Sequence, residues 1–167
     1  MEFGFSLGSN LGDRINFLKS AKDLIQDLDH TFLLEYSPIY ETSPVNVNVE
    51  YSHLNYYNAF IIIESSVAIK KWWTKISCIE ENLGRIRNNT VNSPRTIDID
   101  LIYANSKIIN SDELIIPHPR WFERLFVLKP FSDVRPDLIL PGVSSKVKDI
   151  LDNLKTSEKI NLIQCEW

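Results

Sequence analysis

Cysteine is scarce in this 167-residue sequence, and long apolar runs are missing. Cys78 and Cys165 lie far apart and fit no metal-ligand spacing, so we expect reduced thiols in a cytoplasmic protein. The longest apolar run, residues 59–63, has the length of a strand and falls well short of the ~20 residues of a membrane span. Residues 1–4 lack the basic and apolar regions of a signal peptide. We therefore expect no membrane partner.

An excess of positive charge and the common nucleotide-binding motifs are also missing. The formal net charge of −4 argues against nucleic acid as a partner and is compatible with a local basic pocket for a small anion. No Gly-x-x-x-x-Gly-Lys-Ser/Thr loop occurs. Residues 8–12 have a different glycine spacing and no following lysine, which favours a tight strand-to-helix turn there.

The order of predicted elements indicates the fold class. Apolar patterning predicts strands over residues 2–6, 32–42, 56–64 and 94–102. It predicts helices from an Asp13 N-cap to about residue 29, and from a cap at Ser65 and Ser66 to Gly84. The order strand, helix, strand, strand, helix, strand predicts an α+β protein with a ferredoxin-like βαββαβ core.

The remaining C-terminal part predicts a mixed extension of that core. We expect a small strand or hairpin over residues 107–116, one or two helical turns over 121–128 and a helix over 146–154. No repeat or linker is visible, so residues 1–167 are predicted to form a single domain. RNA-recognition modules share this topology, but residues 58–63 lack their basic-Gly-aromatic-Gly-aromatic signature.

A strand with two carboxylates is the most informative segment. Because strand side chains alternate between faces, Asp98 and Asp100 share one face. The apolar residues expected on the opposite face are Ile97, Ile99, Leu101 and Tyr103. Two carboxylates on one face repel each other, and Mg²⁺ is a natural counter-charge for such a pair. The alternative is a solvated edge strand with an acidic outer face.

Arginines just upstream favour a metal–polyphosphate site. Arg85, Arg87 and Arg95 precede the two Asp residues, and guanidinium groups match phosphate oxygens in pairs. The alternative is a solvated loop with a structural ion pair between Arg95 and the carboxylates. His118 lies between two prolines and near Arg120 and Arg124, so it is either structural or a phosphate contact. Glu80 is either a helix-edge residue or lies at a pocket rim.

Several motifs together carry a family resemblance. They occupy residues 6–14, 40–45, 56–59, 84–87, 94–100, 116–120 and 124–130. In these motifs and their order the chain resembles the 6-hydroxymethyl-7,8-dihydropterin pyrophosphokinase family of folate biosynthesis. Arg-Thr-Ile-Asp-Ile-Asp at 95–100 and Pro-His-Pro-Arg at 117–120 are specific in combination, whereas one alone is not. The resemblance implies an enzyme that transfers diphosphate from ATP to the pterin hydroxymethyl oxygen and releases AMP.

The resemblance also implies roles for individual residues. Two Mg²⁺ ions would be bound by Asp98 and Asp100, and these carboxylates would act in catalysis with Arg85 and Arg95. The residues expected to contact ATP are Glu80, Arg85, Arg87, Arg95, His118 and Arg124. The residues expected to contact the pterin are Thr42, Val45, Tyr56, Asn58 and Phe126. A flat heteroaromatic ring needs aromatic side chains to stack on, and Tyr56 and Phe126 could provide them. The alternative for these two residues is ordinary core packing.

The chain departs from the family at three positions. Asn92 and Asn88 stand where some members have Trp and Lys in the arginine-rich loop, and Pro119 replaces a Tyr. We therefore expect a cytoplasmic, monomeric, magnesium-dependent pyrophosphokinase with ATP and the pterin as its small-molecule substrates. The rivals are a non-catalytic module that binds nucleotide or RNA, and a family member that has lost activity.

Overall fold

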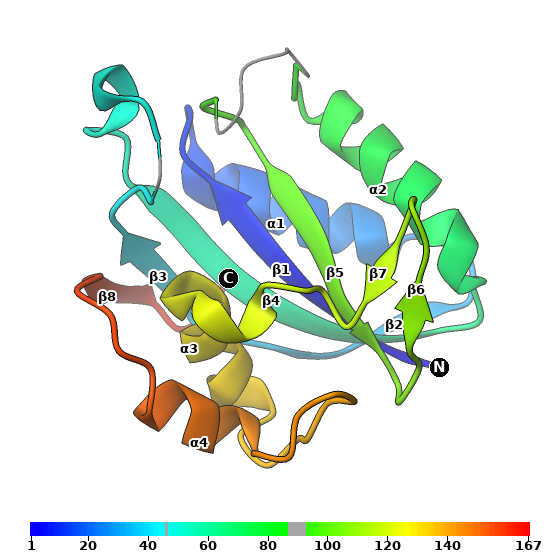
Figure 1. Ribbon diagram of the computed structural model, residues 1–167. Coiled ribbons are helices and arrows are strands. Elements are labelled where there is room, and N and C mark those ends of the chain that lie inside the picture. Colours follow the sequence, from blue (N-terminus) through cyan, green and yellow to red (C-terminus); the bar gives the residue numbers. More distant parts are fainter. Residues whose placement is uncertain (46, 87–92) are drawn as a thin grey trace.

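The computed structural model describes residues 1–45, 47–86 and 93–167 (Figure 1). The strands are β1 Glu2–Ser9, β2 Thr31–Tyr36, β3 Ile39–Thr42, β4 Tyr56–Ser65, β5 Asp98–Ala104, β6 Ile109–Asn110, β7 Ile115–Ile116 and β8 Ile160–Gln164. The helices are α1 Arg14–Gln26, α2 Ile69–Asn82, α3 Leu125–Val134 and α4 Val147–Asp152, with 3-10 turns at Val49–Tyr51 and Trp121–Glu123. Among these residues, no helix combines the length and apolarity that crossing a membrane requires.

The main sheet has the strand order β5-β1-β4-β3-β8, and β2 also pairs with β4. Its neighbouring strands are antiparallel. With β4 between β1 and the β2–β3 segment, the core follows the split β-α-β arrangement and confirms the predicted ferredoxin-like α+β fold. β6 and β7 pair separately and confirm the hairpin expected over residues 107–116.

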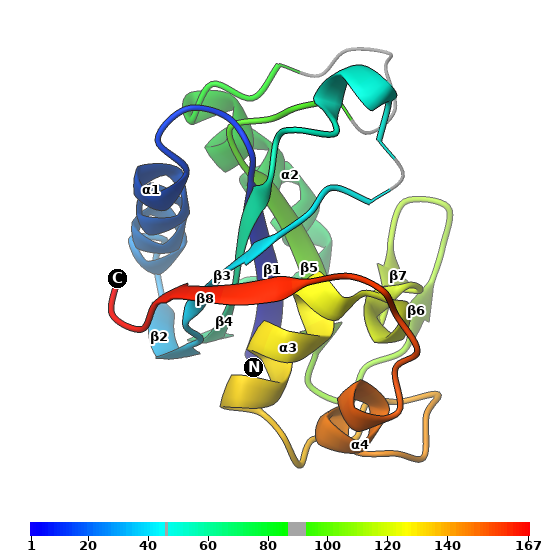
Figure 2. The same ribbon diagram turned by 90° about the vertical axis from the view of Figure 1, so that its left-hand side faces the viewer.

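Helices cover both faces of the main sheet, as Figures 1 and 2 show. On one face α1 and α2 enclose an apolar core that includes Phe5, Ile61 and Trp72, each fully buried. On the other face α3 and α4 pack over a second core that includes Phe60, Tyr103 and Phe131. Because side chains alternate along β4, neighbouring residues such as Phe60 and Ile61 serve different cores. The strand predicted over residues 56–64 is confirmed as β4, and it lies inside the sheet between β1 and β3.

The extended segment predicted over residues 32–42 forms two strands. Pro38 lacks an N–H and separates β2 from β3. Ser37 maintains the connection to β4 across this break, because its N–H donates to the Phe60 carbonyl at 2.8 Å. Its hydroxyl oxygen accepts from the Phe60 N–H at 2.9 Å. The predicted strand is thus divided at Pro38 while its hydrogen bonding to β4 continues.

The predicted position of Tyr103 is wrong. The register between β1 and β5 shifts between Gly4 and Phe5, so Leu101 pairs with Phe5 whereas Tyr103 pairs with Gly4. This bulge turns Tyr103 onto the α3 face, where its ring stacks on Phe131 at a centroid distance of 5.5 Å. Ile97, Ile99 and Leu101 do share the opposite face, as predicted. A bulge leaves no signature in simple alternation, which explains the error.

Helix boundaries agree with expectation in part. The Asp13 carboxylate caps α1 by accepting from the Asn16 N–H at 3.1 Å, as predicted. The cap predicted for α2 is wrong: Ala68 holds the N-cap position, whereas the Ser65 hydroxyl bonds Thr31 within the sheet. Gly84 follows α2 with a φ of 81°, which suits glycine. The helical turns expected over residues 121–128 are present as the 3-10 turn at Trp121–Glu123 and the start of α3, which continues to Val134. The strand β8 is not among the predicted elements.

Candidate active site

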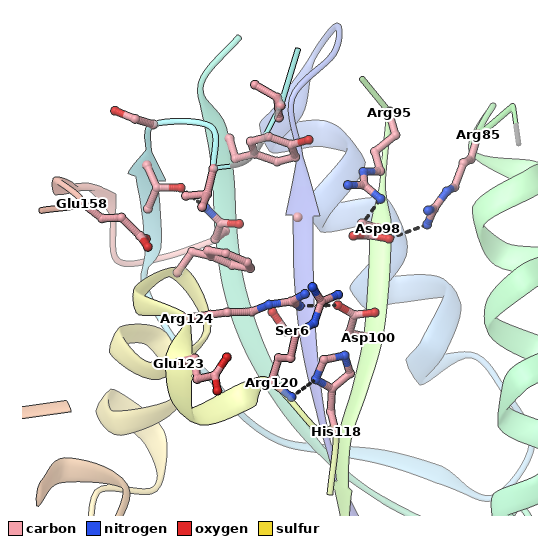
Figure 3. A pocket seen from close by; sticks show the side chains of 18 residues that line it. Ser6, Arg85, Arg95, Asp98, Asp100, His118, Arg120, Glu123, Arg124 and Glu158 are labelled. Atoms are coloured by element: carbon pink, nitrogen blue, oxygen red, sulfur yellow. Dashed lines mark hydrogen bonds and ion pairs between the residues drawn. The ribbon is translucent and has the colours of Figure 1, made fainter. Parts of the chain in front are cut away.

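A cavity of about 420 Å³ opens on the α3 face of the sheet, beside α3 (Figure 3). Its floor is formed by β1, β4 and β5. Asp98 pairs with Gly8 and Asp100 with Ser6, while Gly8 also pairs with Asn58 on the other side. Paired residues lie on the same face of a sheet, so all five of these residues face the cavity. Because Ser6 and Gly8 are small, the floor stays open between the two carboxylates and Asn58. A Cβ on Gly8 would approach the Asn58 Oδ1 to 3.3 Å.

Asp98 lies between two arginines. Its Oδ1 accepts from Arg85 Nη1 at 2.5 Å, and its Oδ2 lies 3.2 Å from Arg95 Nη1. The predicted carboxylate–arginine cluster is thus present, and the ion pair between Arg95 and Asp98 is real. The Asp98 oxygens can still bind a cation or a further donor, because a carboxylate has about four lone-pair sites.

Glu80 supports this cluster from beneath. It is 1% exposed, and its Oε1 accepts from the Ile99 N–H at 2.9 Å and also pairs with Arg85. Arg85 is thereby held between the carboxylates of Glu80 and Asp98. The buried Glu80 is satisfied by these bonds, which is the condition for burying a charged group. Its position indicates that it orients Arg85 and β5 from below the cavity wall.

Asp100 is the less compensated carboxylate of the pair. Its Oδ2 lies 3.6 Å from Arg124 Nη1. Burial, followed by repulsion from Asp98, raises the pKa of Asp100 to about 7, although Arg124 and Arg95 act in the opposite direction. A carboxylate held in this way gains from any added positive charge, which supports the inference that this face of β5 receives a cation.

His118 enters the cavity as a neutral side chain. Burial and the neighbouring charges of Arg124 and Arg120 lower its pKa to about 4. Its Nδ1 accepts from the Arg120 N–H at 3.2 Å, so the proton of the neutral ring belongs on Nε2. His118 is therefore arranged as a hydrogen-bond donor beside Asp100, as Figure 3 shows.

The other end of the cavity is less charged. Tyr56 and Phe126 line it, and Asn58 is 3% exposed at its floor. The Asn58 Nδ2 donates to the Thr42 hydroxyl at 2.9 Å, which fixes the amide and leaves its Oδ1 toward Gly8. This combination of aromatic side chains and a fixed amide suits a flat heteroaromatic ligand.

The structure brings most of the predicted site residues together at this cavity. The predicted residues that line it are Thr42, Val45, Tyr56, Asn58, Arg85, Arg95, Asp98, Asp100, His118, Arg124 and Phe126. Glu80 lies beneath them. Arg87, with the departures at Asn88 and Asn92, falls outside the described residues.

Several residues of the site were not predicted. Asn10 fixes the start of the β5 segment, because its Oδ1 accepts from the Arg95 N–H at 2.8 Å and its N–H donates to the Arg95 carbonyl at 3.2 Å. It belongs to the motif at residues 6–14, which could have indicated a role. Arg120 and Glu123 also line the cavity and lie close to predicted residues. Glu158 lines it as well, and no sequence signal pointed to it.

The donor set limits which metal could be held. Within the described ranges, no group of three or more His, Cys, Asp or Glu side chains is arranged to hold a metal ion. The two carboxylates of Asp98 and Asp100 are sufficient for Mg²⁺, which commonly takes one or two carboxylates and completes its coordination shell with phosphate oxygens and water. The residues present therefore fit a metal that arrives with a polyphosphate.

Comparisons with known proteins agree with this chemistry. A family model described as 7,8-dihydro-6-hydroxymethylpterin-pyrophosphokinase matches residues 4–136. The chain is 36% identical over 129 residues to the 2-amino-4-hydroxy-6-hydroxymethyldihydropteridine pyrophosphokinase of Bacillus subtilis, covering 77% of this chain and 75% of that protein. It is 37% identical over 152 residues to the folic acid synthesis protein fol1 of Pneumocystis carinii, covering 89% of this chain and 20% of that protein.

The solved structures support the fold. A crystal structure of Plasmodium falciparum HPPK-DHPS superimposes with a TM-score of 0.72 at 16% identity, covering 90% of this chain and 45% of that one. The chain spans about a fifth of the fol1 protein of Pneumocystis carinii and under half of the Plasmodium protein. Because the family model and the Bacillus relative both match most of its length, the chain belongs to the 7,8-dihydro-6-hydroxymethylpterin-pyrophosphokinase family.

Proposed function

We propose that this chain transfers diphosphate from ATP to the hydroxymethyl group of 6-hydroxymethyl-7,8-dihydropterin. The observation that carries the proposal is the division of one cavity into two ends. Asp98 and Asp100 lie among three arginines at one end, and Tyr56, Asn58 and Phe126 lie at the other. A polyphosphate suits the first end and a flat ring suits the second, so the two substrates can meet between them.

The reaction exchanges one oxygen at phosphorus for another. The hydroxymethyl oxygen forms a bond to the β-phosphorus of ATP, and the bond between that phosphorus and the α–β bridging oxygen breaks. AMP leaves with the bridging oxygen, and the hydroxyl proton is released to the surroundings. Such transfers depend on alignment and on stabilisation of charge that develops on the phosphate oxygens.

The residues of the charged end are suited to that task. Arg85, Arg95 and Arg124 present guanidinium groups to phosphate oxygens, and the neutral His118 can donate from Nε2. Asp98 and Asp100 would hold two Mg²⁺ ions, as the family resemblance implies. Magnesium, when bound, would neutralise phosphate charge. Glu80 and Asn10 act indirectly, since they orient Arg85 and the Arg95 backbone.

Residues of the other end would bind the pterin. Tyr56 and Phe126 offer aromatic surfaces for stacking, and Asn58 offers its Oδ1 to an N–H group of the ring. Thr42 fixes that amide through its hydroxyl. Val45, which also lines the cavity, offers backbone groups to the polar edge of the ring.

We further propose that residues 1–167 act as one domain and as a cytoplasmic monomer. Support for one domain comes from β4 and β5, whose side chains contribute to both cores. Light scattering of the purified chain tests the monomer, and a mass of twice the sequence value would contradict it.

The decisive experiment identifies the products. The chain is incubated with ATP, Mg²⁺ and the pterin alcohol, and the products are identified by mass spectrometry. We expect AMP and the pterin diphosphate ester in equal amounts, and no AMP when the alcohol is omitted. ADP as the product would indicate an ordinary kinase. Binding of both substrates without turnover would indicate a non-catalytic or inactive family member.

A further inference from the structure

Glu158 lies at the end of the cavity opposite the Asp98–Asp100 pair. Figure 3 shows it on the far side of the cavity from Asp98 and Asp100, with its carboxylate directed inward. It precedes β8, whose first residue, Ile160, pairs with Thr42 of β3. The strand pairing therefore places Glu158 beside the segment that starts at Thr42, which is the proposed pterin end.

The Glu158 carboxylate is only half satisfied by the protein. Its Oε2 is buried and has no hydrogen-bond partner in the described part of the chain. Burial raises its pKa, while a side-chain hydrogen bond from Thr156 acts in the opposite direction. An unpaired buried carboxylate oxygen is costly, and buried polar atoms nearly always have partners in folded proteins. An oxygen of this kind at a cavity wall is suited to accept a hydrogen bond from a ligand.

The proposed reaction decides which part of the pterin reaches this oxygen. The hydroxymethyl group must lie near the polyphosphate, and hence near Asp98 and Asp100. The pteridine carries its 2-amino group on the ring that does not bear the hydroxymethyl group, so the amino end points toward Thr42 and Glu158. The Asn58 Nδ2 donates to Thr42, and the amide has a single acceptor atom, Oδ1. A second acceptor is needed for the adjacent N–H groups of the amino end.

We propose that the Glu158 carboxylate accepts a hydrogen bond from the 2-amino group of the pterin and thereby selects 2-amino pteridines over 2-oxo pteridines. This inference rests on the proposed function. A 2-oxo analogue places a carbonyl oxygen against the carboxylate, so the attraction becomes repulsion. Glu158 is thus a specificity residue supplied by the C-terminal segment, outside the motifs that carry the family resemblance.

The test measures binding of two ligands to two variants. The ligands are 6-hydroxymethylpterin and its 2-oxo analogue, each with a non-hydrolysable ATP analogue and Mg²⁺. The variants are Glu158→Gln and, as a matched control, Asp152→Asn, which alters an exposed acid on α4. We expect the unaltered chain to prefer the pterin at least tenfold. In Glu158→Gln the pterin affinity should fall about tenfold, the size expected for a charge-assisted hydrogen bond, and the preference should disappear.

The remaining measurements separate the possible failures. Affinity for the ATP analogue and the thermal unfolding midpoint should stay unchanged in both variants, and Glu158→Asp should recover part of the preference. Equal pterin affinity in the unaltered chain and Glu158→Gln would overturn the inference and leave the proposed function intact. Equal loss of ATP-analogue and pterin affinity would overturn it in favour of a structural role. If the unaltered chain binds neither pteridine, the proposed function fails and the inference fails with it.

Discussion

The two faces of the main sheet use the same strands for different purposes. Toward α1 and α2, β1 presents the apolar and fully buried side chains of Phe3, Phe5 and Leu7. Toward α3, the same strand presents Gly4, Ser6 and Gly8, and only the part beneath α3 is covered. One face is therefore a closed core, whereas the other is half core and half cavity.

One face of the sheet thus contributes mainly to stability, whereas the other also carries the chemistry. The closed face gains from apolar burial and contains few polar groups, while the open face concentrates charges that are satisfied mainly by one another. Substitutions on the closed face should alter the free energy of unfolding and leave catalysis unchanged. Substitutions in the cavity should lower catalysis and change stability only through the charges that they remove. Those beneath α3 should alter both.

The largest expected effect comes from removing one large aromatic residue from each core. Trp72 packs on Phe3 and Phe5 at centroid distances of 5.3 and 4.9 Å, and Phe131 stacks on Phe60 at 4.3 Å. Either Trp72→Ala or Phe131→Ala should lower the free energy of unfolding by about 3–5 kcal/mol, measured by urea denaturation.

The same two variants test the comparison through their kinetics. Phe131→Ala should also raise the KM for the pterin, because α3 begins at Leu125 and carries Phe126. Trp72→Ala, assayed where it is folded, should keep a normal KM. If both variants raised the KM equally, the closed face would not be independent of the site.

The second effect concerns Asp100. Asp100→Asn keeps the shape but removes the charge, so we expect turnover to fall by on the order of 10²–10³-fold, the scale of lost electrostatic stabilisation at an active site. Asp112→Asn, in the exposed β6–β7 loop, is the control and should keep full activity. A normal rate in Asp100→Asn would contradict the proposed role.

Stability should change in the opposite direction in the metal-free Asp100→Asn protein. Because the pKa of Asp100 is raised in the folded state, its ionised form is disfavoured by folding. The penalty is complete above pH 7, decreases as the pH falls below that value, and disappears only below the ordinary pKa of 3.8. Asp100→Asn should therefore stabilise the metal-free protein at pH 8 more than at pH 5, as thermal unfolding at the two pH values would show.

A smaller effect is expected at Gly4, where β1 turns toward the α3 core. A Cβ at this position would overlap the Tyr103 ring and come within 2.9 Å of Phe60 Cε1. Gly4→Ala should therefore cost about 1–3 kcal/mol of stability through overpacking. Its measured unfolding midpoint in urea checks this. An unchanged midpoint would mean that the Tyr103 ring can shift to accommodate a Cβ at position 4 without loss of stability.

The outcome at individual residues shows what a sequence can reveal. The placement of Asp98 and Asp100 on one face followed from strand alternation alone, and the Asp13 cap followed from local chemistry. Tyr103 was misplaced because a bulge depends on pairing with β1, which alternation does not encode. β8 and Glu158 were missed because their place depends on contacts with β3 far away in sequence. Local rules thus predicted the elements, whereas side-chain placement at the cavity required tertiary structure.

The smallest effect concerns His118 and pH. Its pKa is lowered from the ordinary 6.5 to about 4, so the unfolded chain binds this proton more readily between those values. The contribution of neutral His118 to stability is therefore present above pH 6.5 and is lost as the pH falls toward 4. His118→Gln should remove this part of the acid destabilisation. Thermal unfolding at pH 7 and pH 5 measures the difference between the variant and the unaltered chain.

The same histidine also reports on the charged end of the cavity. The positive charges of Arg120 and Arg124 contribute to its lowered pKa, after burial. A bound polyphosphate would offset those charges, so an ATP analogue should raise the His118 pKa, as NMR titration of its ring protons would show. An unchanged pKa with the analogue bound would place the phosphates away from His118. In that case the arginines at this end of the open face would serve the fold and not the nucleotide.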